Sequence, residues 1–237
     1  NDLNIFLNLE TTDKKNLHKI LSYTPRATLI KCIINNTDMK ILDYKVKSEI
    51  ENMLKSINSG NNLELEIRIG NITNRFNPNI DKNFFLSIIE KLNTSGFSRS
   101  QQDFVDVYSD GIRTRYLYSP EFSKYIQFES IYKNRIANVD IKTKEILDVD
   151  IRVSYSSENK IFQYNKEGES YRKIRTSFTD SEKNFSVDLT EIITGTFEDR
   201  EFKTDSNTNV TFQCELELLT NNIDLDKVFK LLMNIIK

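Results

Sequence analysis

Two short segments carry glutamates at a spacing that suits cation binding. The first covers residues 63–69 and reads Leu-Glu-Leu-Glu-Ile-Arg-Ile, so apolar and charged side chains alternate with the period of a β-strand. Glu64, Glu66 and Arg68 therefore share one face, each about 7 Å from the next. The opposite face of this strand is entirely apolar.

The second segment lies near the other end of the chain. Residues 212–218 read Phe-Gln-Cys-Glu-Leu-Glu-Leu, which places Glu215 and Glu217 on one face and the apolar residues on the other. Four carboxylates on one wall would repel and raise one another's pKa. We therefore expect a cation or buried basic groups between them.

Basic residues repeat with the same period in the segments between these two ends. Arg113 and Arg115 share a face within 111–118, and Lys173 and Arg175 share a face within 170–179. Other charged or polar residues that share a face within one segment are Gln127, Glu129, Lys133 and Arg135; Asp150, Arg152, Ser154, Ser156 and Glu158; and Asp188 and Thr190. Arg and Lys neutralise phosphate oxygens, whereas carboxylates hold Mg²⁺ or Mn²⁺, so together they are typical of a site for a metal-bound polyphosphate.

Strand-like segments dominate the chain from about residue 102 onward. The predicted strands are 63–69, 102–109, 111–118, 124–135, 146–158, 160–165, 170–179, 184–194 and 209–219, and the polar stretch 198–209 is predicted to be a mobile loop. Apolar stripes on the predicted helices can cover the outside of the sheet, which would turn the charged faces inward. Closing the sheet also removes its exposed edges. We predict an α+β, mainly β fold: a closed antiparallel eight-stranded β-barrel with helices packed on its outside.

A simpler interpretation is an antiparallel sheet whose polar face lies in water. Solvated faces are loose mixtures of Thr, Lys, Glu, Asn and Gln, whereas these strands carry tight repeats of Glu-x-Glu, Arg-x-Arg and Lys-x-Arg. The residue types therefore favour the inward-facing arrangement.

The 237 residues are interpreted as one domain. It comprises a helical preface over 1–58, a barrel over 60–220 that includes a helix from Asp81 to Leu92, and a C-terminal helix over 224–237. The chain begins at Asn1 and ends within the last helix, which suggests a domain excised from a longer protein.

A net charge of −2 argues against a broadly basic surface, and two cysteines form neither a disulfide framework nor a zinc motif. With no signal-like start and no long apolar run, we expect an intracellular protein that does not enter a membrane.

The order of these motifs resembles the triphosphate tunnel metalloenzymes. Glu64-Leu65-Glu66-Ile67-Arg68 is similar to the first-strand motif of that family, and Glu215-Leu216-Glu217 is similar to its last-strand metal motif. The strands bearing Arg113 and Arg115, Lys133 and Arg135, Asp150 to Glu158, Lys173 and Arg175, and Asp188 and Thr190 follow in the same order, over about residues 60–220. The succession is most similar to the RNA triphosphatase branch, found in capping enzymes of fungi, protozoa and large DNA viruses.

The resemblance implies a role for each matched residue. Glu64, Glu66 and Glu217 would contact Mg²⁺ or Mn²⁺, with Glu215 in the same cluster. Arg113 or Arg115, Lys173 and Arg175 would bind the β- and γ-phosphates, and Glu158 would orient or deprotonate the attacking water. Asp188 and Thr190 would organise the basic residues, and Arg68, Lys133, Arg135, Arg152 and Asp150 are further phosphate-binding or supporting candidates. Two departures are Arg68, where Lys is common, and Leu219, where some relatives carry a further Glu.

The implied reaction is hydrolysis of the γ-phosphate of 5′-triphosphate RNA, which leaves a 5′-diphosphate end for guanylylation. A guanylyltransferase domain would then follow in the same chain. The sequence contains neither a cysteine-phosphatase loop nor a P-loop, so a direct attack by water is expected. Alternatives are hydrolysis of free nucleoside triphosphates or inorganic triphosphate, a cyclase of the same fold, and a non-catalytic anion-binding module. Richness in Asn, Lys and Ile favours a large DNA virus as the source, and hence a cytoplasmic viral factory or virion.

Overall fold

The computed structural model describes residues 63–143, 148–164, 167–204, 208–220 and 225–236. The predicted helical preface over 1–58 lies outside these residues. By their contacts, Asn1–Lys45 and Val46–Lys237 form separate units, and every described residue belongs to the second. Its described elements are β1 (Leu63–Ile72), β2 (Phe76–Asn77), α4 (Lys82–Asn93), β3 (Ser98–Ser109), β4 (Ile112–Ser119), β5 (Lys124–Ile141), β6 (Asp150–Ile161), β7 (Glu169–Thr179), β8 (Phe185–Glu198), β9 (Glu201–Thr204), β10 (Val210–Leu218) and α6 (Leu225–Ile236).

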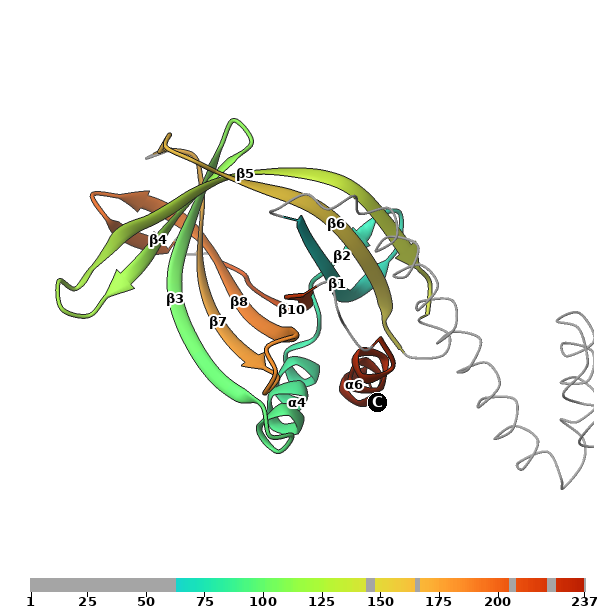
Figure 1. The fold of residues 1–237 in the computed structure, drawn as a ribbon. Coiled ribbons are helices and arrows are strands. Elements are labelled where there is room, and N and C mark those ends of the chain that lie inside the picture. Colours follow the sequence, from blue (N-terminus) through green and yellow to red (C-terminus); the bar gives the residue numbers. More distant parts are fainter. Residues whose placement is uncertain (1–62, 144–147, 165–166, 205–207, 221–224, 237) are drawn as a thin grey trace, which may run out of the picture. The chain divides into compact units, whose positions relative to one another are not determined.

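Eight of the described strands close into a ring. Their order is β10-β1-β6-β5-β4-β3-β7-β8, and β8 pairs again with β10 (Figure 1). Each of these neighbouring pairs is antiparallel. The short strands β2 and β9 pair with β1 and β8 and stand outside the ring. The predicted closed antiparallel eight-stranded barrel is therefore confirmed.

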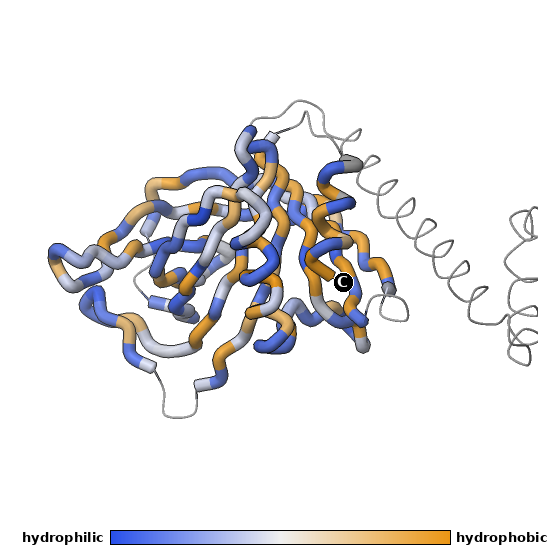
Figure 2. The backbone as a smooth tube through the Cα atoms, turned by 90° about the horizontal axis from the view of Figure 1, so that it is seen from below, coloured by the Kyte–Doolittle hydropathy of each residue, from blue (hydrophilic) through white to orange (hydrophobic). Residues whose placement is uncertain are grey.

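Apolar and polar residues alternate along the strands, as Figure 2 shows for the described backbone. Ile67 on β1 lies opposite Val153 on β6 and Leu216 on β10, and all three are buried on the outer side of the ring. Residues directly opposite in an antiparallel pair point to the same face. The charged residues between them therefore point into the lumen.

Both described helices pack on the outside of the barrel. Asp81 caps α4 by accepting hydrogen bonds from the backbone amides of Asn83 and Phe84, at 2.8 and 3.2 Å. Phe85 then packs against Phe212 of β10, with ring centroids 5.0 Å apart. Helix α6 lies against α4 (Figure 1). The predicted helices at these two places are confirmed, and neither described helix is long and apolar enough to cross a membrane.

Two predicted segments are wrong in part. No separate strand covers 160–165, because β6 continues through Ile161 and residues 162–164 are irregular. The stretch 198–209 is not simply a loop, because it contains β9, which forms a hairpin with β8. Phe202 of this hairpin packs against a buried outer cluster that includes Phe197 and Tyr116, which explains why a polar segment is ordered there.

A bulge in β5 changes which residues share a face. Arg115 lies opposite Glu129, whereas the next residue, Tyr116, lies opposite Gln127, so Phe128 has no partner across the pair. Gln127 consequently joins the face of the buried, outward-pointing Tyr116. The prediction that Gln127 shares the face of Glu129 is therefore wrong.

Candidate active site

The lumen contains a cavity of about 850 Å³ whose lining is mainly charged. All eight strands of the ring contribute to it, and the lining carries both Lys or Arg and Glu side chains. The predicted site residues that line it are Glu64, Glu66, Arg68, Arg113, Arg115, Lys133, Arg135, Glu158, Lys173, Arg175, Thr190, Glu215 and Glu217. Thus residues from opposite ends of the sequence meet in one cavity.

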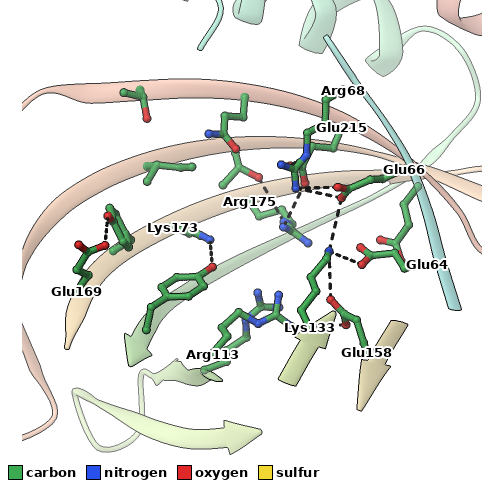
Figure 3. A pocket seen from close by; sticks show the side chains of 18 of the residues that line it. Glu64, Glu66, Arg68, Arg113, Lys133, Glu158, Glu169, Lys173, Arg175 and Glu215 are labelled. Carbon is green, nitrogen blue, oxygen red and sulfur yellow. Dashed lines mark hydrogen bonds and ion pairs between the residues drawn. The ribbon is translucent and has the colours of Figure 1, made fainter. Parts of the chain in front are cut away.

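Pairing of β1 with β10 builds the acidic wall of the cavity, which carries Glu64, Glu66, Glu215 and Glu217. Glu66 on β1 lies opposite Glu217 on β10, and Arg68 lies opposite Glu215. Arg68 bridges two of these carboxylates: its Nη2 is 3.0 Å from Glu66 Oε1 and its Nε is 2.8 Å from Glu215 Oε1 (Figure 3). Arg68, on the same strand as Glu64 and Glu66, therefore supplies part of the positive charge that was expected between the carboxylates.

Glu217 differs from the other glutamates of this wall. It makes no hydrogen bond or ion pair with another residue in the described part of the chain. Burial raises the pKa of Glu217, and the nearby Glu64 and Asp188 carboxylates raise it further, to about 7. A bound cation would therefore offset both the burial of the Glu217 carboxylate and its repulsion by Glu64 and Asp188.

The acidic wall offers carboxylate ligands of the kind that divalent cations bind, but these carboxylates are not yet gathered around a single point. Among the described residues, no three His, Cys, Asp or Glu side chains are already gathered as a metal site. Glu66 Oε1 is nevertheless buried with Arg68 Nη2 3.0 Å away, and Glu217 makes no ion pair with a described residue, although the Arg175 charge lowers its pKa. Carboxylate oxygens are the ligands that Mg²⁺ and Mn²⁺ prefer. Lys133 contacts Glu64 Oε2, so a cation bound at that oxygen would compete with Lys133.

A lysine links the acidic wall to the candidate base. Lys133 Nζ donates a hydrogen bond to Glu64 and lies 3.3 Å from Glu158 Oε1 (Figure 3). Arg113 Nη2 lies 3.8 Å from the other oxygen of Glu158. The Glu158 carboxylate is thus held between two cations at the cavity surface.

The basic wall of the cavity consists of Arg113, Arg115, Lys173 and Arg175. Asp106 binds two of these side chains, although it was not among the predicted site residues. Arg115 binds it through two hydrogen bonds of 2.8 and 3.0 Å, and Lys173 Nζ donates another at 2.9 Å. Burial alone would raise the pKa of Asp106, but Lys173 and Arg115 outweigh it and hold that pKa well below its usual range. The sequence did contain a signal for this contact, because a hairpin turn at Asp110-Gly111 places Asp106 opposite Arg115.

Asp188 supports Arg175 from behind the cavity surface. Arg175 Nη1 lies 2.8 Å from Asp188 Oδ2, and its Nε donates to Thr190 Oγ1 at 3.3 Å. Burial lowers the pKa of Arg175, but the Asp188 and Glu215 carboxylates outweigh it and raise that pKa. The guanidinium thus remains charged, with its orientation fixed by Asp188 and Thr190 of β8.

Asp150 and Arg152 are not brought to the cavity. The Asp150 carboxylate accepts hydrogen bonds from the backbone amides of Ile72 and Thr143, at 2.7 and 2.8 Å. Arg152 pairs with Asp140 at 2.6 Å. Both join β6 to neighbouring segments beyond the cavity lining.

Sequence reasoning also missed several other residues of the lining. These are Tyr108, Gly111, Glu169, Tyr171, Ile192, Thr194, Thr211 and Gln213, and Glu129 was noted only for its face. Tyr171 is two residues before Lys173 on the same strand, and this spacing would have indicated that the two side chains share a face. Tyr108 shares a face with Asp106 on β3, and only the pairing of β3 with β7 brings it to Lys173.

The barrel and its charged lumen define the triphosphate tunnel fold. No protein-family model matches the sequence, and no curated protein matches it. Among solved structures, the chain is similar to the Pct1 RNA triphosphatase of S. pombe, with a TM-score of 0.57 and 16% identity over 74% of this chain and 77% of that one. It is also similar to S. pombe Pct1 in complex with the Spt5 CTD, with a TM-score of 0.55 and 14% identity over 81% of each chain. At these identities the likeness establishes the fold.

Proposed function

We propose that this chain is a metal-dependent RNA 5′-triphosphatase that removes the γ-phosphate from 5′-triphosphate RNA. The observation that carries the proposal is the presence, in one cavity, of a glutamate wall with an unpaired Glu217 and of basic side chains held by buried aspartates. The fold shared with Pct1, an RNA triphosphatase, supports the choice of substrate. The reaction would be the first step of mRNA capping.

The basic side chains would bind the substrate and neutralise developing charge. Lys173, Arg175 and Arg115 are already oriented by Asp106 and Asp188, so little reorganisation is needed when phosphate oxygens arrive. Phosphoryl transfer depends mostly on such positioning and charge neutralisation. A divalent cation held by Glu64, Glu66 and Glu217 would supply Lewis-acid chemistry at the phosphate oxygens.

Glu158 would act on the attacking water. Its carboxylate is held by Lys133 and Arg113, so its orientation is defined before substrate binds. The water oxygen forms a bond to the γ-phosphorus while the bond from that phosphorus to the β-bridging oxygen breaks. The water proton passes to Glu158, and the products are inorganic phosphate and a 5′-diphosphate end.

The further context of the reaction is part of the same proposal. The diphosphate end is the substrate of guanylylation, so we place a guanylyltransferase domain downstream, in a capping enzyme of the large-DNA-virus type. The cavity recognises triphosphate charge and could also accept free nucleoside triphosphates, which is the alternative activity. A non-catalytic anion-binding module is the alternative without chemistry.

Release of γ-labelled phosphate from 5′-triphosphate RNA tests the proposal. Wild type is compared with Glu64→Gln, Glu217→Gln and the control Glu90→Gln, which alters an exposed residue of α4 away from the lumen. We expect Mg²⁺- or Mn²⁺-dependent release that EDTA abolishes, a loss of at least about 100-fold in the two lumen variants, and full activity in the control. An inactive wild type, or lumen variants as active as the control, would contradict the proposal.

A further inference from the structure

Two tyrosines that the proposed mechanism does not use lie beside the basic wall. Tyr108 of β3 and Tyr171 of β7 meet edge to face, with ring centroids 5.9 Å apart and an interplanar angle of 75°. Both line the cavity. The Lys173 ammonium donates a hydrogen bond to Tyr108 Oη at 3.1 Å and lies 5.4 Å from the centre of that ring. A group bound to Lys173 therefore has aromatic surface next to it.

Strand register extends this apolar surface around Lys173. Tyr171 is two residues from Lys173 on the same face of β7, and Ile192 of β8 lies directly opposite Lys173. Among the described residues of the cavity lining, Tyr108, Tyr171 and Ile192 are the only ones with large apolar side-chain surfaces. The rest of the lining is charged or polar, apart from Gly111.

The tyrosines lie toward solvent, away from the acidic wall. Figure 3 places Glu169 at the opposite side of the cavity from Glu64 and Glu66, with Lys173 between them. Glu169 is exposed and accepts a hydrogen bond from Tyr171 Oη at 3.0 Å, and Tyr108 is 37% exposed. Along the cavity the order is therefore carboxylates, basic residues, tyrosines and solvent.

We propose that Tyr108 and Tyr171 form a stacking platform for the base of the 5′-terminal nucleotide, whose triphosphate binds Lys173 and Arg175. The inference rests on the proposed function and specifies which part of the substrate the cavity recognises besides phosphate. Tyr108 accepts a hydrogen bond from Lys173 and Tyr171 donates one to Glu169, and these bonds fix the rings and keep the entropic cost of ordering them low. Stacking on tyrosine accepts any base, because every base has a π-face. The platform takes a nucleoside 5′-triphosphate, either free or at the end of RNA, and prefers both to inorganic triphosphate.

Equilibrium binding tests the platform independently of turnover. Calorimetry would compare β,γ-imido ATP with inorganic imidodiphosphate, for wild type, Tyr171→Ala, Tyr171→Phe and the control Tyr118→Ala. Tyr118 is 41% exposed, close to the 37% of Tyr108, and does not line the cavity. We expect Tyr171→Ala to weaken nucleotide binding about 5- to 100-fold more than imidodiphosphate binding, and Tyr171→Phe and Tyr118→Ala to keep the wild-type ratio.

Steady-state kinetics with tripolyphosphate, ATP and 5′-triphosphate RNA would separate the two proposals. A similar rise in KM for ATP and RNA in Tyr171→Ala would show that the platform serves both sources, and a rise for RNA alone would assign it to the RNA end. Equal weakening of both calorimetric ligands, or no weakening, would overturn the platform. A wild type that binds the nucleotide analogue but hydrolyses none of the three substrates would overturn the proposed function and leave the calorimetric result valid.

Discussion

Buried aspartates, rather than the residues that face substrate, hold the side chains of the basic wall in place. Asp106 is fully buried and binds both Arg115 and Lys173. The same strand carries Asp103, which makes a matching two-point contact with Arg172 on the outer face of the barrel. The pair therefore provides a natural comparison of one carboxylate–guanidinium contact inside the lumen and one outside.

We expect Asp106→Asn to reduce both stability and activity, and Asp103→Asn to reduce stability alone. In the first variant Lys173 and Arg115 lose a shared anion and are no longer held in place, so activity should fall at least about tenfold. Removing one partner from a buried ion pair costs about 3–5 kcal/mol of unfolding free energy, and the partly exposed outer pair costs less. Urea unfolding and phosphate release measure the two effects. Equal loss of activity in both variants would contradict a role for Asp106 in the lumen.

Glu217 should make stability depend on pH in the absence of divalent cations. The folded protein holds the Glu217 proton up to a pKa of about 7, whereas the unfolded chain releases it near the ordinary glutamate pKa of 4.5. Between these values the folded state binds more protons, so its stability falls as pH rises, by about 3 kcal/mol in total.

Glu217→Gln removes this cost. Measured in EDTA by urea unfolding, we expect the variant to be about 3 kcal/mol more stable than wild type at pH 8 and nearly equal to it at pH 4.5. The exposed control Glu90→Gln should show no such dependence. A stability difference for Glu217→Gln that is the same at both pH values would mean that Glu217 does not hold its proton.

Among elements, the contact of α4 with β10 stabilises the strand that carries Glu215 and Glu217. Phe85 is 2% exposed and packs on Phe212, whereas its neighbour Leu86 is 44% exposed. We expect Phe85→Ala to cost about 3–5 kcal/mol of unfolding free energy, and Leu86→Ala to cost about 0.5 kcal/mol. Urea unfolding would measure both costs. Similar costs for the two variants would show that α4 does not pack on the barrel as described.

The elements differ in how well the sequence predicted them. Strands β1 and β10 were predictable because one strand face is apolar and the other charged, which is the clearest period-two signal in the chain. The bulge at Phe128 was not, because register shifts depend on contacts across the strand pair. The strand β9 was also not predicted, because Phe202 is one apolar residue in a polar stretch and its packing partners lie far away in the sequence.

At the scale of the whole barrel, ring closure is what gathers the site. Pairing of β10 with both β1 and β8 brings Glu217 beside Glu66 and Glu215 beside Asp188. The sequence predicted the face of each of these residues, but a shared face does not fix a position along the barrel. Asp150 and Arg152 illustrate this limit: their face was predicted correctly, yet they lie beyond the cavity lining.

The central claim is that the lumen binds a metal-coordinated triphosphate between its acidic and basic walls. Anomalous diffraction at the manganese edge, from crystals grown with Mn²⁺ and tripolyphosphate, tests this claim most directly. We predict a manganese peak among Glu64, Glu66 and Glu217, with phosphate density extending to Lys173 and Arg175. A manganese peak only outside the lumen, or a lumen without phosphate density at saturating ligand, would contradict the account.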